Sequence, residues 1–90
     1  MALSGQTTVT TAGTEVPLNA DQPCNAVIIK ALPANTGVMY IGNNSSNAIT
    51  STTGYPLSAN EYVVIETKNL NSWYVDATVN GEGVAWIVMA

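Results

Sequence analysis

Residues 73–89 read WYVDATVNGEGVAWIVM, and this stretch decides the fold class. Apolar residues on both sides of Asn80-Gly81 recur at every second position, which is the period of a β-strand. Asn-Gly between two strand patterns is typical of a hairpin turn, because both residues tolerate positive φ. The stretch therefore predicts an antiparallel hairpin. Its second strand, 84–89, is apolar on both faces, so we expect it to be central in a sheet or covered by a neighbour.

The same kind of pattern continues through the rest of the chain. Short runs rich in β-branched and aromatic residues are bounded by Gly, Pro, Asn or Ser, which is typical of strands. We expect strands at 7–11, 14–18, 26–32, 38–42, 55–57, 61–67, 73–79 and 84–89. No segment has trustworthy helical periodicity. The chain is therefore predicted to be one all-β domain, 1–90: an antiparallel β-sandwich or jelly-roll-like barrel of about eight short strands.

Three further expectations concern how the strands are arranged. Segments 26–32 and 62–65 are apolar at nearly every position, which predicts burial on both sides. Pro17 and Pro56 end strand patterns, as edge strands allow. Residues 11–20 resemble 52–59. Either the two halves form four-strand units packed face to face, joined by the polar tract 43–53, or unrelated strands reuse the same turn residues.

Charged residues are scarce: the chain has two lysines and six carboxylates, its net charge is −4, and histidine is absent. Histidine is the side chain best suited to proton transfer near neutral pH. An acidic chain without arginine lacks the basic surface that nucleic acids and anionic membranes require. We therefore expect no enzyme activity, cofactor, metal, nucleic acid or membrane partner. Since 47% of the residues are hydrophobic, the composition indicates a folded module that works by surface contact.

Individual side chains fit the same interpretation. The carboxylates form no obvious pair and are expected to be solvated surface groups. Cys24 has no basic partner, which favours a buried structural thiol over a nucleophile. Trp73 and Trp86 are expected to pack in the core of adjacent strands, although an exposed aromatic could stack on a sugar. Tyr55 and Tyr74 are the better candidates for exposed contacts.

The N-terminal segment admits two interpretations. Residues 1–6 could be an arm that adds a strand to a neighbouring subunit, or the frayed start of an ordinary first strand. The candidate interface residues are accordingly Leu3, Thr7 and Val9, together with Tyr55 and Tyr74. The segment lacks a basic and apolar leader, and no window reaches the length of a membrane span. Synthesis in a cytoplasm is therefore expected.

Two stretches resemble a known family: TVTTAGTEVPL at 8–18, and NLNSWYVDA at 69–77 followed by NGEGV at 80–84. They are similar to small virion structural proteins of tailed bacteriophages, of the capsid decoration (cement) type. The resemblance implies a β-rich module, often trimeric, that sits on the capsid exterior, bridges major capsid protein subunits and has no catalytic residues. We therefore expect a homo-oligomer, with a trimer favoured, that binds the major capsid protein and stabilises its lattice. Similar segments occur in phage tail and fibre proteins. The alternative is thus a tail or fibre module, or a carbohydrate-binding β-sandwich using Tyr55, Tyr74 and the 43–53 loop.

Overall fold

The computed structural model describes residues 2–19, 21–43, 49–50 and 53–89. Within these ranges the chain is all-β, as predicted, with one short 3₁₀ turn, η1. The elements are β1 (Ala2–Val9), β2 (Val16–Pro17), β3 (Ala26–Ala31), β4 (Met39–Gly42), β5 (Tyr55–Leu57), β6 (Tyr62–Glu66), η1 (Leu70–Ser72), β7 (Tyr74–Ala77) and β8 (Glu82–Met89).

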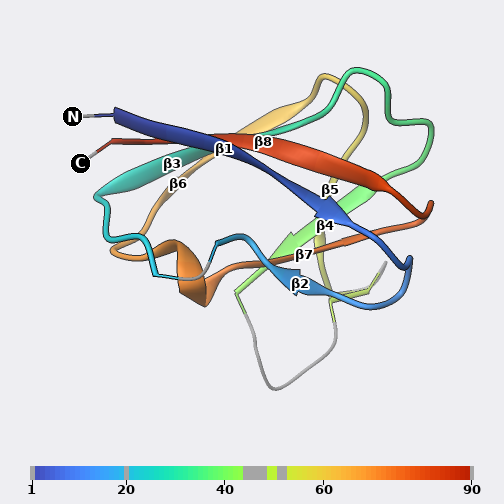
Figure 1. Ribbon diagram of the computed structural model, residues 1–90, viewed down its shortest axis with the longest axis horizontal. Helices are drawn as coiled ribbons and strands as arrows, with labels where there is room; N and C mark the ends of the chain where they lie inside the picture. The colour runs from blue at the N-terminus through green and yellow to red at the C-terminus, as the bar shows by residue number, and fades with distance from the viewer. Residues whose placement is uncertain (1, 20, 44–48, 51–52, 90) are drawn as a thin grey trace.

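The strands form two four-stranded antiparallel sheets (Figure 1). Sheet A has the order β1-β8-β3-β6 and sheet B the order β2-β7-β4-β5. The pairs β1–β8, β2–β7, β3–β6 and β4–β5 are those of one long hairpin, rolled up so that its strands are shared between the two sheets. This is the arrangement of a jelly roll, one of the two architectures expected from the sequence.

The predicted hairpin at 73–89 is wrong. β7 pairs with β2 and β4 in sheet B, whereas β8 pairs with β1 and β3 in sheet A. The turn between them is a corner from one sheet to the other. Of its two central residues only Gly81 has positive φ (83°), and a single positive φ at the third position fits a type II turn. The hairpin turn expected for Asn-Gly requires positive φ at both residues.

The order of the strands also tests the expectations about the two halves of the chain, the place of β8 and the two prolines. Each sheet takes two strands from each half of the chain, so the halves are not separate units packed face to face. β8 is central in sheet A, as its apolar character predicted. Pro17 and Pro56 lie on β2 and β5, the two edge strands of sheet B. An edge strand tolerates a missing N–H, because that side of the strand has no ladder to complete.

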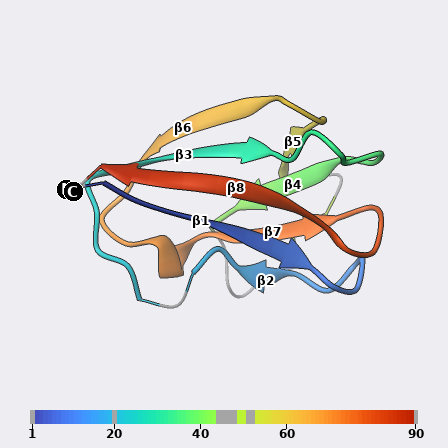
Figure 2. The same cartoon turned by 45° about the horizontal axis from the view of Figure 1, so that its top comes forward.

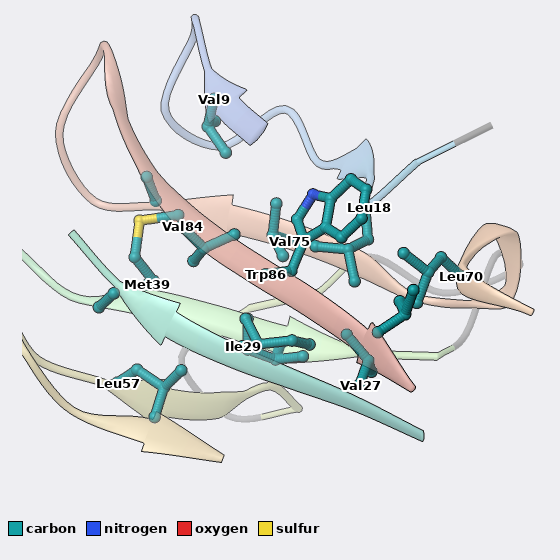
Figure 3. Close-up of a cluster of buried hydrophobic side chains, with 14 of the residues drawn as sticks. Val9, Leu18, Val27, Ile29, Met39, Leu57, Leu70, Val75, Val84 and Trp86 are labelled. Carbon is teal, nitrogen blue, oxygen red and sulfur yellow. The ribbon is translucent and has the colours of Figure 1, made fainter. Parts of the chain in front are cut away.

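The core fills the space between the sheets, where alternate residues of each strand meet (Figure 3). Trp86 is its largest side chain and is 9% exposed. Gly5 lies directly opposite on β1 and leaves room for the indole, since a Cβ there would lie 2.7 Å from Trp86 Cζ2. The indole Nε1 donates to Thr7 Oγ1 at 3.1 Å, and this hydroxyl donates to the Leu18 carbonyl. The Thr7 hydroxyl, held by Trp86, therefore links sheet A to the residue that follows β2.

Trp86 confirms the prediction of core packing, and Trp73 packs against the same core while half-buried. The two residues do not lie in adjacent strands. Trp73 precedes β7 in sheet B, and Trp86 belongs to β8 in sheet A. They therefore reach the core from different sheets.

Candidate functional site

Five of the six carboxylates hold loops in place instead of forming a reactive pair. Glu15 accepts from the Ile49 N–H, Asp21 from Asn69 Nδ2, Glu61 from the Ser58 N–H, Asp76 from the Gly13 and Ala77 N–H groups, and Glu82 from the Thr36 and Gly37 N–H groups. An acceptor that caps backbone donors in this way fixes the conformation of its loop. The expectation of solvated surface carboxylates is wrong for Asp76, which is buried, whereas Asp21, Glu61 and Glu66 are exposed.

Asp76 departs furthest from the sequence prediction, because it is only 7% exposed. The β1–β2 loop folds over it, and Gly13 donates to Asp76 Oδ1 at 3.0 Å. Gly13 has φ 89°, a conformation that favours glycine. Asn80 Oδ1 accepts from the Ala12 N–H at 2.7 Å, which fixes the same loop. No local pattern predicts these contacts, since the loop and its acceptors lie more than sixty residues apart.

Glu82 is the carboxylate whose titration is perturbed. Hydrogen bonds from the Thr36 backbone, then from Gly37 and the Thr36 hydroxyl, lower the pKa of Glu82 below its usual value. A lowered pKa keeps the side chain ionised near neutral pH, which is the opposite of what a general acid needs. Glu82 therefore acts as an anionic clamp on the β3–β4 loop.

Cys24 is a buried free thiol, as predicted. Its Sγ donates to the Thr67 carbonyl at 3.3 Å, and burial raises the pKa of the thiol. Both effects favour the unreactive thiol form. Among the described residues there is no cluster of three histidine, cysteine, aspartate or glutamate side chains that could hold a metal ion.

The N-terminal candidates belong to the folded unit of their own chain. β1 pairs with β8 from Ala2 to Val9. Val9 is fully buried in the core and offers no surface, while the Thr7 hydroxyl is engaged with Trp86 and Leu18. Leu3 lies opposite Val88 in the ladder, and its side chain lies outside the described part of the chain. In this structure the segment is therefore a first strand, paired along its length.

The two tyrosines proposed as exposed contacts are not brought together. Tyr55 lies opposite Ile41, on the side of sheet B that faces the core, and is 57% exposed at the margin of the sandwich. Tyr74 lies between Pro17 and Gly42 on the opposite face. Tyr55 borders a small apolar cavity of 180 Å³ between the sheets, and Trp73 Nε1, another group at this cavity, has no hydrogen-bond partner in the described structure. The tyrosines do not form one stacking platform.

The most distinctive surface is the outer face of sheet A, which sequence reasoning missed. It consists of the outward residues of four strands: Ser4, Gln6 and Thr8 of β1, Ala85, Ile87 and Met89 of β8, Ala26, Ile28 and Lys30 of β3, and Tyr62, Val64 and Glu66 of β6. Four of the six large hydrophobic residues that are exposed in the described structure lie here, namely Tyr62 (65%), Val64 (53%), Met89 (49%) and Ile87 (42%).

The apolar side chains of this face are contiguous. Ile87, Ile28 and Val64 lie directly opposite one another on neighbouring strands, close enough for cross-strand contact. A shallow groove of about 520 Å³ is lined by residues of β1, β8 and β3, Ile28 and Ile87 among them. Contiguous exposed apolar surface is typical of interaction sites. The prediction that segments 26–32 and 62–65 are buried on both sides is wrong, because no other described element covers the outer face of sheet A and Val64 is 53% exposed.

The outer face of sheet B is different, because loops of the same chain cover part of it. The β1–β2 loop is bonded to Asp76, and Ile49 lies against Gly42. Ile49, one of the described residues of the β4–β5 connection, is 3% exposed and so is buried against this face. The molecule is thus asymmetric: one outer face is covered in part, and the other presents apolar side chains to solvent.

No family model matches the sequence, and no match was found among the curated proteins or the solved structures. Within the described ranges no helix has the length and apolar character needed to cross a membrane.

Proposed function

We propose that this protein is a structural subunit of a larger assembly, and that it docks through the outer face of sheet A. The observation that carries the proposal is the exposure of Tyr62, Val64, Ile87 and Met89 on one side of the molecule. Only two charged residues, Lys30 and Glu66, interrupt this face. Little charge would have to be desolvated when a partner covers it, which favours a stable contact.

The assembly we favour is the exterior of a tailed-phage capsid, with the major capsid protein as partner. The resemblance of residues 8–18 and 69–84 to capsid decoration proteins supports this choice, as does the acidic net charge of −4, which suits the outside of a DNA-filled shell better than its inside. The jelly-roll fold itself does not distinguish a capsid role from carbohydrate binding, because capsid and lectin domains both have this fold. In this role the chain has no reaction to catalyse and stabilises the lattice by covering its subunits.

The direct test is binding to capsids of the virus that encodes the chain, prepared without this protein. Ile87→Glu places a charge at the centre of the outer face, and we expect it to weaken binding by at least about tenfold. The matched control is Val79→Glu, because Val79 is a similarly exposed apolar residue (38% against 42%) in the β7–β8 turn, away from this face. The control should bind as the natural protein does.

Two results would overturn the proposal in different ways. Equal binding by the Ile87→Glu and natural proteins would exclude the outer face as the docking surface. No binding of the natural protein to capsids would exclude the decoration role. A glycan array covers the alternative of a carbohydrate-binding module: a sugar-dependent signal that is lost in Tyr55→Ala would favour that function instead.

A further inference from the structure

The edge of sheet A at β6 is open. The hydrogen bonds at both ends of the β3–β6 ladder, Thr67 N to Asn25 O and Ala31 N to Glu61 O, involve odd-numbered residues of the β6 segment. Because pairing alternates along an antiparallel strand, the N–H and C=O groups of Tyr62, Val64 and Glu66 point away from the sheet. Figure 2 shows β6 as the outermost strand, with no other strand beyond it.

This edge also lacks the devices that usually block strand addition. Both edge strands of sheet B contain a proline, which interrupts a row of donors. β6 has neither proline nor lysine, and its residues 62–65, YVVI, are all strong strand formers. The other edge of sheet A, β1, contains Gly5 and presents the polar Ser4, Gln6 and Thr8 outward. The edge best suited to pairing is therefore β6.

We propose that β6 pairs with β6 of a second copy of this chain, antiparallel about a two-fold axis at Val64. In this register Val64 lies opposite Val64 of the second copy, and Tyr62 lies opposite Glu66. These are the three residues whose backbone groups are free, and each directly opposed pair would exchange two hydrogen bonds. The strand is therefore complementary to itself in the register that uses every outward group, as an isologous interface requires.

The charges on the outer face fit the same register. Lys30 lies beside Tyr62 on β3, and pairing would place Glu66 of the second copy on the other side of Tyr62. Lys30 and Glu66 would then be about 10 Å apart at Cα, two strand spacings, on the same face. Long side chains can approach each other across that distance. Within the described residues of one copy, neither the Lys30 nor the Glu66 side chain has a hydrogen-bond or ion-pair partner.

The pair would double the surface proposed to dock. A two-fold axis perpendicular to the sheets puts both outer faces on the same side of one continuous eight-stranded sheet, with Ile87, Ile28 and Val64 of each copy in a single row. Two linked faces bind a repeating lattice more tightly than one, through effective concentration. The inference deepens the proposed assembly function and rests on it, and it differs from the trimer that the resemblance implies.

Two substitutions of one residue separate backbone pairing from apolar contact. Val64→Pro keeps an apolar side chain but removes the outward N–H, which β3 does not use. Val64→Thr keeps the N–H and lowers the apolar character of the side chain. By light scattering and sedimentation, we expect the natural protein to form dimers and Val64→Thr to retain them. Val64→Pro should raise the dissociation constant of the dimer by at least about tenfold.

Hydrogen exchange of the natural protein gives a second readout that needs no substitution. The amides of Tyr62, Val64 and Glu66 should exchange at least about tenfold more slowly at high protein concentration than after dilution. Concentration-independent exchange of these amides, a trimer as the stable species, or dimers of Val64→Pro as tight as those of the natural protein would overturn the inference. If Val64→Pro does not fold, the exchange measurement decides. Capsid binding by a natural protein that forms no dimer would leave the proposed function standing while this inference fails.

Discussion

Replacing Thr7 with valine should destabilise the domain through two hydrogen bonds at once. The Thr7 hydroxyl accepts from Trp86 Nε1 at 3.1 Å and donates to the Leu18 carbonyl. Valine has nearly the same shape but can do neither. The substitution therefore leaves an indole N–H and a carbonyl without their partner while it preserves the packing around them, which isolates the polar contribution.

The expected loss in the free energy of unfolding is about 2–3 kcal/mol. An unsatisfied polar group costs about 1–3 kcal/mol when buried, and two groups are affected. Because Thr7 is only half-buried, water can reach part of the site, which places the sum at the lower end. For a domain of this size such a loss corresponds to a melting temperature lowered by roughly 8–24 °C.

Urea unfolding monitored by tryptophan fluorescence measures this directly. Thr7→Ser is the control, because it keeps the hydroxyl and removes one methyl group, at a cost below about 1 kcal/mol. Equal free energies of unfolding for the valine and serine variants would refute the reasoning, since the hydroxyl would then contribute nothing.

Three further outcomes follow from single contacts. Gly5→Ala should lower the free energy of unfolding in urea by about 1–3 kcal/mol, because the added Cβ would overlap the rigid indole of Trp86; an unchanged value would show that the strand moves aside freely. The lowered pKa of Glu82 means that its contribution to stability is present above the unfolded value near 4.5 and is lost as pH falls through the folded value. The unfolding free energy of the natural protein should therefore fall more steeply with acid than that of Glu82→Gln, and parallel curves would contradict this. Cys24, whose thiol pKa is raised by burial, should react with a disulfide reagent at least about a hundredfold more slowly in the folded than in the urea-unfolded protein; similar rates would mean that the thiol is accessible.

The sequence predicted the strands better than it predicted their partners. Alternation and β-branched residues are local signals, and they located 55–57 and most of the other strands to within a few residues. Strand pairing depends on residues far apart in the sequence, since β1 pairs with β8 about eighty positions away. Asn80-Gly81 correctly predicted a turn, but a turn sequence does not determine whether its two flanking strands join the same sheet. The hairpin prediction failed for that reason.

The site was hidden for a related reason. A run such as Ala26-Val27-Ile28-Ile29 is apolar on both faces, and from the sequence alone two-sided burial is the simplest interpretation. The structure buries Val27 and Ile29 and leaves Ile28 on the outer face of sheet A. An apolar residue facing solvent is therefore distinguished from one facing the core only when the layers are known. The start of β1, by contrast, had no apolar signal at Ser4-Gly5-Gln6, because its place in the fold comes from pairing with β8.

The few charged residues of the chain lie mostly away from the outer face of sheet A. Five carboxylates are held by loops, and Lys68 donates to Asn25 at 3.1 Å, which leaves Lys30 and Glu66 as the charged residues of the outer face of sheet A. A face of this kind is easy to desolvate except at those two positions, where burial of an unpaired charge is costly. The β6 pairing proposed here would set the lysine of each copy near the glutamate of the other before any lattice covers them. Self-association would thus lower the desolvation cost of docking, so the two proposed contacts should be coupled: the dimer should bind a capsid more tightly per face than the monomer, beyond the gain from having two faces.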